Sequence, residues 1–268
     1  VNISPSMNSE ETPPTVWITG SGGLIGHALR QSAAVPPGWH PRGLRRTDLE
    51  LTDFSAVERA FHRERPGAII HCAALSRSPA CQSDPPRARQ LNVEVTRHLA
   101  ALACEIPFFF FSTDLVFDGR QGAYRETDPV NPLSVYAETK SIAEEIVLAN
   151  PRHTVLRTSL NHGISPTGDR AFNEELVNAW LAGKNTPLFT DEYRSPIPAT
   201  ATARAVRHAR SSRSRSASAA AIRIRYSSRR ASSRPNRIPG RPACRRTPRS
   251  TSRSARAWSR ARARTRSS

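Results

Sequence analysis

The sequence predicts an α/β fold in which a doubly wound parallel sheet precedes a small, incomplete C-terminal lobe and a disordered Arg/Ser-rich tail. Short apolar runs alternate with amphipathic stretches from Thr15 onward, and a glycine-rich turn follows the first run. After Thr200 the chain loses any sustained helical or strand periodicity. Because strands that alternate with helices form parallel sheets through right-handed crossovers, these observations give the fold class.

Five apolar runs are the expected strands of this sheet, and stretches of helical character separate them. The strands are expected at residues 15–20, 39–46, 67–74, 106–114 and 153–160. The helices are expected at residues 24–34, 54–65, 86–104, 135–145 and 172–183. The phenylalanine run at 108–111 suits a strand buried on both faces, which places the fourth strand at the centre of the sheet.

The formal net charge of +18 hides two unlike regions. Residues 201–268 hold 21 arginines and no lysine or acid, so this tail carries +21 and residues 1–200 carry −3 by subtraction from +18. The basic signal therefore belongs to the tail alone, which is too poor in apolar residues to fold. Such a tail would bind nucleic acid only nonspecifically, through phosphate contacts.

A lost reading frame near residues 205–208 is a second explanation of the tail. A GC-rich gene that is read out of frame yields the same bias toward arginine, serine, alanine and proline. Translation of the gene in its other two frames separates the two explanations. Recovered strand and helix patterns would establish the frameshift, and noise in both frames would rule it out.

The cysteines and the apolar runs indicate a cytoplasmic protein without metal or membrane partners. Cys72, Cys81, Cys104 and Cys244 form no C-x-x-C pair and no zinc spacing. No apolar run approaches the roughly 18 residues that a membrane helix needs, and the polar start of the chain is unlike a signal peptide.

The segment TGSGGLIG places Gly20, Gly23 and Gly26 between an expected strand and an expected helix. Glycines at this point allow positive-φ turns and close backbone approach to a pyrophosphate, which the helix N-terminus then attracts. The pattern predicts a dinucleotide site of the Rossmann type. A glycine-rich turn without a ligand is the alternative.

The end of the second expected strand selects the cofactor. The stretch RGLRR carries Arg42, Arg45 and Arg46, and the first acid is Asp48. Arginine suits the 2′-phosphate of NADP(H), whereas an acid there suits the ribose hydroxyls of NAD(H). NADP(H) is therefore favoured, NAD(H) is the alternative cofactor, and a solvated basic surface is the alternative without a ligand.

Tyr136 and Lys140 lie four residues apart in an expected helix, so their side chains are neighbours. An ammonium beside a phenol is expected to lower the phenol pKa toward the range in which it exchanges protons. Ser112 and Thr113 end the central strand, where open α/β sheets bind ligands. The Y-x-x-x-K pattern alone is more often a surface pair, and its value here comes from these neighbours.

The segments TGSGGLIG, HCAALS, STDLVFDG, ETDPVNPLSVYAETK, RTS and FTDEYRSPIPA occur in this order between Thr15 and Ala203. Together they resemble the extended short-chain dehydrogenase/reductases, most closely the dTDP-4-dehydrorhamnose reductase family. The resemblance implies NADPH-dependent reduction of the 4-keto group of a nucleotide-activated 6-deoxy sugar. An NAD-dependent sugar-nucleotide epimerase or dehydratase and a noncatalytic NADP-binding regulatory subunit are the alternatives.

The resemblance also implies the roles of individual residues. Thr113, Tyr136 and Lys140 would be catalytic, and Tyr136 and Lys140 would also hold the cofactor. Asp114 and Arg194 would join Thr113 at the substrate. The other cofactor contacts would come from Gly20, Gly23, Leu24, Ile25, Gly26, Arg45, Arg46, Asp53, Ala73 and Ala74.

The expected organisation follows from these assignments. A disordered extension occupies residues 1–14, an NADP-binding domain residues 15–160, a partial substrate lobe residues 161–204 and the low-complexity tail residues 205–268. The expected partners are the nucleotide sugar and, as an open alternative, a second copy in a homodimer. Leu115 and Leu160 replace an aromatic residue and a tryptophan that usually lie beside the sugar nucleotide in these reductases, so the sugar is left open.

Overall fold

The structure is a computed structural model that describes residues 13–31, 35, 38–187 and 194–213 of the 268-residue chain. Residues 1–12 of the extension predicted to be disordered, and the tail beyond residue 213 with its predicted nonspecific binding of nucleic acid, lie outside the described residues. None of the helices in the described ranges has the length and hydrophobicity that crossing a bilayer requires.

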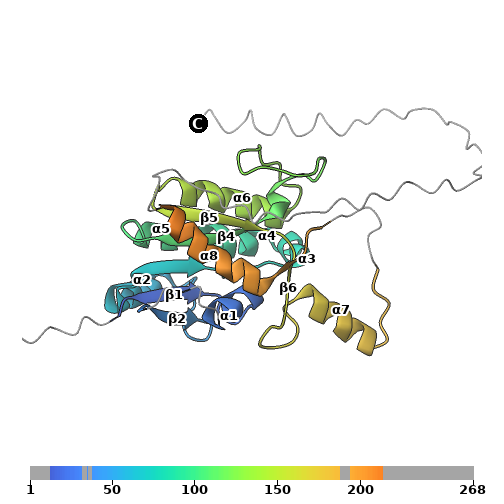
Figure 1. Ribbon diagram of the computed structural model, residues 1–268, viewed down its shortest axis with the longest axis horizontal. Coiled ribbons are helices and arrows are strands. Elements are labelled where there is room, and N and C mark those ends of the chain that lie inside the picture. Colours follow the sequence, from blue (N-terminus) through green and yellow to red (C-terminus); the bar gives the residue numbers. More distant parts are fainter. Residues whose placement is uncertain (1–12, 32–34, 36–37, 188–193, 214–268) are drawn as a thin grey trace, which may run out of the picture. The chain divides into compact units, whose positions relative to one another are not determined.

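Five parallel strands form one sheet in the order β2–β1–β3–β4–β5 (Figure 1). The strands are β1 (Thr15–Thr19), β2 (His40–Leu44), β3 (Ala68–His71), β4 (Phe108–Thr113) and β5 (His153–Thr158). The chain moves from β1 outward to β2 and then returns to the other side of β1 with β3. The gap between the carboxyl ends of β1 and β3 is therefore the switch point at which open α/β sheets bind ligands.

Helices cover both faces of this sheet, which confirms the predicted doubly wound fold (Figure 1). One layer contains α1 (Leu24–Gln31) and α8 (Ala199–Arg213), and the other contains α2 (Phe54–Glu64), α5 (Val95–Leu102) and α6 (Val135–Leu148). Because successive strand side chains point to opposite faces, Phe109 and Phe111 pack in the first layer and Phe108 and Phe110 in the second. The phenylalanine strand is thus buried on both faces, as predicted, but its predicted place at the centre of the sheet is wrong, because β3 is the middle strand and β4 lies between β3 and β5.

The helix expected at residues 86–104 is divided by one π-helical turn. The structure has α4 (Pro85–Arg89), η1 (Gln90–Glu94) and α5 in succession, after the short α3 (Ser78–Ser83). Within η1, Asn92 accepts a hydrogen bond from the Leu75 N–H at 2.8 Å and donates one to Thr139 Oγ1 at 3.0 Å. The Asn92 side-chain amide thus links the segment after β3 to α6 by hydrogen bonds.

The chain after β5 forms a small second sheet and two helices. β6 (Asn161–His162) pairs with β7 (Ile197–Pro198), and α7 (Phe172–Leu181) lies between them in sequence. α8 then returns to the main sheet. The boundary predicted between residues 204 and 205 is wrong, because it falls inside α8, where the small side chains of Ala203, Val206 and Ala209 pack into the core.

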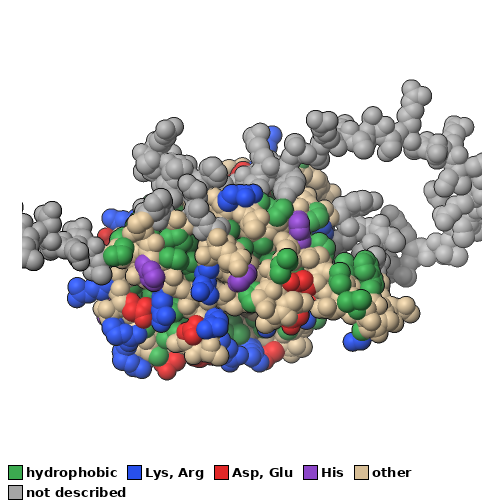
Figure 2. Space-filling view, turned by 60° about the horizontal axis from the view of Figure 1, so that its bottom comes forward, with side chains coloured by type: hydrophobic (Ala, Val, Ile, Leu, Met, Phe, Trp, Pro, Cys, Tyr) green, Lys and Arg blue, Asp and Glu red, His purple; other side chains and the backbone are tan. Residues whose placement is uncertain are grey.

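α7 leaves much of its apolar surface exposed. None of its residues is buried, and the side chains of Trp180 and Leu181 are 63% and 82% exposed. Hydrophobic side chains gather where α7 lies in the space-filling view (Figure 2). A helix with an apolar face of this size usually packs against another element.

Candidate active site

The glycine-rich turn between β1 and α1 lies at the switch point of the sheet. Gly20 has a φ of +66°, and a Cβ atom there would lie 2.7 Å from the Ala73 backbone nitrogen at the end of β3. At Gly26 an added Cβ would lie 2.4 Å from the Gly20 carbonyl oxygen. The Gly23 N–H closes the turn by donating to the same carbonyl at 2.9 Å. Backbone approach this close is available to glycine only.

This turn forms a cradle that fits a dinucleotide pyrophosphate. Leu24 and Ile25 begin α1, and the first N–H groups of a helix have no intrahelical acceptors and carry partial positive charge. Ala73 and Ala74 follow β3 on the other side of the switch point, where the Ala73 N–H donates to Thr19 Oγ1 at 3.3 Å. Anions bind readily to such helix ends.

Arg45 lies beside this cradle and Arg46 follows it in sequence, but each is paired with an acid. The Arg45 Nε lies 3.2 Å from Asp48 Oδ2, and the Arg45 side-chain carbons lie next to Gly22. The Arg46 Nε donates to Glu50 Oε2 at 2.7 Å, and this bond lowers the pKa of the Glu50 carboxyl. Both arginines were predicted to bind the 2′-phosphate of NADP(H). Asp48 and Glu50 would compete with such a phosphate for their guanidinium groups.

Asp53 has a local role at the start of α2. Its Oδ1 accepts a hydrogen bond from the Ala56 N–H at 2.9 Å, which caps the helix. Its predicted place near the adenine stays a prediction.

α6 begins where the sequence predicts and presents Tyr136 in its first turn. Ser134 caps the helix by accepting a hydrogen bond from the Ala137 N–H at 3.2 Å. Tyr136 and Lys140 therefore follow each other one turn apart, at the carboxyl edge of the sheet.

Thr113, the last residue of β4, meets Tyr136 at this edge. The Thr113 side chain lies close enough to the Tyr136 phenol to act on its pKa, and Thr113 Oγ1 donates a hydrogen bond to Asp114 Oδ1 at 3.3 Å. The Ser112 hydroxyl is buried and has no hydrogen-bond partner in the described part of the chain. The structure therefore brings Thr113, rather than Ser112, together with Tyr136.

Tyr136 is protonated at neutral pH. Burial raises the pKa of its phenol to about 12, and Asp114 raises it further, while the neighbouring Thr113 side chain acts in the opposite direction. The expectation that the Lys140 ammonium lowers this pKa is wrong for the structure described here, because desolvation dominates. The phenol thus holds the proton that a general acid must deliver.

Lys140 is buried, with 3% of its surface exposed. Its Nζ lies 3.8 Å from the centroid of the Phe110 ring, a cation–π contact from the adjacent strand. Burial lowers the pKa of the Lys140 ammonium from 10.5 to about 7, and the Glu144 carboxylate acts in the opposite direction. Lys140 therefore titrates near neutral pH.

Replacement of Lys140 by methionine is expected to stabilise the fold at pH 6–7. Because the folded pKa of about 7 lies below the ordinary 10.5, the unfolded chain binds a proton that the folded chain lacks between these two values. The free-energy cost of burying the charged Lys140 is present in full below pH 7 and disappears as the pH rises to 10.5. Lys140→Met should therefore raise the free energy of unfolding by about 2–4 kcal/mol at pH 6, and by less at pH 9.

Urea denaturation of both proteins across this range measures the difference. Lys184→Met, at an exposed lysine, is the matched control and should change the free energy of unfolding little at any pH. A Lys140→Met effect that stays constant from pH 6 to pH 9 would contradict the assignment.

Asp114 and Arg194, both predicted at the substrate, form an ion pair next to Thr113. Arg194 Nη2 donates to Asp114 Oδ1 at 2.9 Å. The Ser159 hydroxyl donates to the other oxygen, Oδ2, at 2.7 Å. Residues from three distant parts of the chain thus meet beside Tyr136, and Ser159 was absent from the sequence prediction.

Comparison with known proteins identifies the family. Residues 14–230 match the family described as RmlD substrate binding domain. The chain belongs to this family.

Relatives of this RmlD-family chain include both an enzyme and an enzyme subunit. The chain is 38% identical over 144 residues to methionine adenosyltransferase 2 subunit beta from Bos taurus, a match that covers 50% of this chain and 43% of that protein. It is 33% identical over 190 residues to dTDP-4-dehydrorhamnose reductase from Streptomyces griseus, covering 67% of this chain and 59% of that enzyme. The matches thus span about half the length of these curated relatives.

Two solved structures share the fold of the RmlD-family chain with a TM-score of 0.67. A dTDP-4-dehydrorhamnose reductase from Clostridium acetobutylicum is 26% identical, with 75% of this chain and 71% of that chain covered. The enzyme of the same name from Bacillus anthracis, 22% identical with 75% and 72% covered, was solved in complex with NADP. These likenesses confirm the Rossmann-type fold.

A buried ion pair, missed in the sequence, supports the site of this RmlD-family chain. Arg157 Nη2 lies 2.7 Å from Glu144 Oε2, and the Arg157 guanidinium lies 5.0 Å from the Phe117 ring. The Glu144 carboxylate also raises the pKa of Lys140, against the larger effect of burial. An arginine directly after the buried residues 153–156 of β5 was the available signal, because a largely buried guanidinium requires an acidic partner.

Proposed function

We propose that this chain reduces the 4-keto group of a nucleotide-activated 6-deoxy sugar with NADPH, as in dTDP-L-rhamnose biosynthesis. The observation that carries the proposal is the meeting of Tyr136 and Thr113 with the Asp114–Arg194 ion pair, in which Asp114 also accepts a hydrogen bond from Thr113. These groups lie at the carboxyl edge of the sheet, which also holds the glycine cradle. Family membership and the Streptomyces relative support the same reaction class.

Each residue has a defined task in this reaction. NADPH, when bound, supplies a hydride to the keto carbon. Thr113 donates a hydrogen bond that orients the carbonyl, and Tyr136 gives its phenolic proton to the oxygen that becomes negative. In its protonated form Lys140 stabilises the phenolate left on Tyr136. Asp114 and Arg194 offer an acceptor and a donor to the sugar or its phosphates.

The cofactor in this proposal is NADP(H), with NAD(H) as the alternative. Arg45 and Arg46 support NADP(H), since both follow β2 and the Arg45 side chain lies next to Gly22 of the glycine cradle. Glu50 and Asp48 could instead receive the ribose hydroxyls of NAD(H).

A noncatalytic cofactor-binding subunit is the second candidate function. The likeness to the bovine subunit favours it, and so does the exposed apolar face of α7, which marks a lobe with little packing. An epimerase or dehydratase that holds NAD⁺ is a third candidate function, and such an enzyme would consume no NADPH.

One experiment separates these candidates. The full chain is titrated with NADPH, and dTDP-4-dehydro-L-rhamnose is then added while the absorbance of NADPH is followed. The reductase proposal expects saturable binding and a loss of absorbance that requires the sugar. Binding without turnover would favour the subunit, and a chain that fails to bind NADPH would overturn the proposal.

A further inference from the structure

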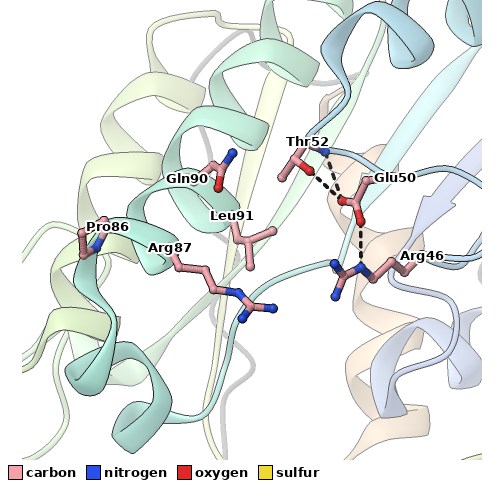
Figure 3. A pocket seen from close by; sticks show the side chains of 7 residues that line it. All are labelled: Arg46, Glu50, Thr52, Pro86, Arg87, Gln90 and Leu91. Atoms are coloured by element: carbon pink, nitrogen blue, oxygen red, sulfur yellow. Dashed lines mark hydrogen bonds and ion pairs between the residues drawn. The ribbon is translucent and has the colours of Figure 1, made fainter.

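A cavity opens between the segment after β2 and the stretch formed by α4 and η1. Its walls come from two stretches of chain that face each other (Figure 3). The residues that line it are Arg46, Glu50, Thr52, Pro86, Arg87, Gln90 and Leu91.

The two arginines of this cavity differ in their partners. Arg46 is held by Glu50, whose other oxygen accepts hydrogen bonds from the Thr52 N–H at 3.3 Å and hydroxyl at 2.9 Å. Arg87 donates its backbone N–H to Asp84 Oδ1 at 3.1 Å, while its guanidinium has no acidic partner within the described ranges. Figure 3 shows this guanidinium extending from α4 into the space opposite Arg46.

We propose that Arg87 is the residue that binds the ribose 2′-phosphate of NADP(H), with Arg46 on the opposite wall. This inference rests on the proposed use of NADP(H). Arginine binds phosphate through a pair of parallel N–H donors, and an arginine without an acidic partner need not break an ion pair first. Arg46 must share its guanidinium between Glu50 and the phosphate, so Arg87 supplies most of the selectivity over NAD(H).

The position of the cavity fits this role. The pyrophosphate site is the glycine cradle, against which the Arg45 side chain lies at Gly22. Arg46 is one residue further from β2, where a doubly wound fold places the adenosine ribose. Arg87 reaches the same space from α4, a helix that the sequence prediction did not assign to the cofactor.

The test compares two small ligands that differ only in the phosphate. Adenosine 2′,5′-bisphosphate and AMP are titrated into the full chain and into its Arg87→Ala and Arg87→Lys variants. Arg87→Ala should weaken binding of the bisphosphate about 10-fold or more and that of AMP less than about 2-fold. Arg87→Lys keeps the charge but loses the paired donors, so its effect on the bisphosphate should be intermediate.

Arg89→Ala is the matched control, because it removes one positive charge from the same helix. The Arg89 guanidinium faces Glu138 instead, at 2.7 Å. This control should leave the ratio of the two affinities unchanged. Equal effects of Arg87→Ala and Arg89→Ala on the bisphosphate, or no effect of Arg87→Ala, would overturn the inference and leave the proposed reductase standing. A wild-type chain that binds neither ligand would overturn the cofactor proposal itself.

Discussion

Replacement of Tyr136 by phenylalanine is expected to lower kcat by about 100-fold or more, which is the usual scale of general acid catalysis. The variant loses the phenolic proton while it keeps the ring, and the Thr113 hydroxyl can still donate to Asp114. Because the glycine cradle is untouched, NADPH affinity should stay within about 3-fold of wild type. Steady-state kinetics and an NADPH titration measure the two quantities.

Tyr124→Phe provides the control for this experiment. The Tyr124 hydroxyl donates a hydrogen bond to Asp118 at 2.5 Å, and the Tyr124 ring stacks on Phe117. Like Tyr136→Phe, this substitution removes one phenolic hydroxyl and keeps the ring. Its effect on kcat should be far smaller. Wild-type turnover in Tyr136→Phe would remove Tyr136 from the mechanism.

Gly26→Ala should abolish most of the affinity for NADPH and destabilise the fold. The new Cβ would lie 2.4 Å from the Gly20 carbonyl oxygen and 2.8 Å from Ser21 Cα, and both of these atoms belong to the backbone. The helix must move away from the turn to relieve this contact, which displaces the amides of the cradle. We expect a loss of about 1–3 kcal/mol in the free energy of unfolding and at least a 10-fold weaker NADPH affinity.

Gly122→Ala is the matched substitution, because a Cβ there would meet no atom within 4 Å. This control should fold and bind NADPH like the wild type. Chemical denaturation gives the stability of each protein, and titration of the folded variants gives their affinity. Wild-type NADPH affinity in Gly26→Ala would show that the turn is not the pyrophosphate site.

The succession of strands and helices along the chain and the glycine turn could be predicted because their signals are local, whereas the order of the strands in the sheet was not predicted. Four consecutive phenylalanines can be buried on both faces only in a central strand. α8 was missed for a physical reason: its buried side consists of alanines, Thr202 and Val206, which resemble the low-complexity stretch that follows. Packing of Ala203 and Val206 against the sheet, invisible in the composition, decides its structure.

The chemistry of the site was harder to predict than the fold, because it depends on contacts between residues that are distant in the sequence. Asp114 and Arg194 are 80 residues apart, and only the family resemblance brought them together before the structure did. The pKa of Lys140 is set by burial beside Phe110, which no spacing rule reveals. The pairing of Arg46 with Glu50 was visible as a four-residue spacing, but this rule applies to helices and these residues lie in a loop.

A crystal structure of the chain with NADP⁺ tests the central claim most directly. The account predicts that the pyrophosphate lies within hydrogen-bond distance of the amides at Gly23–Ile25. It also predicts that the nicotinamide C4 faces the space beside the Tyr136 hydroxyl. A dinucleotide bound away from the β1–α1 turn, or a Tyr136 hydroxyl that points away from the nicotinamide, would contradict the account.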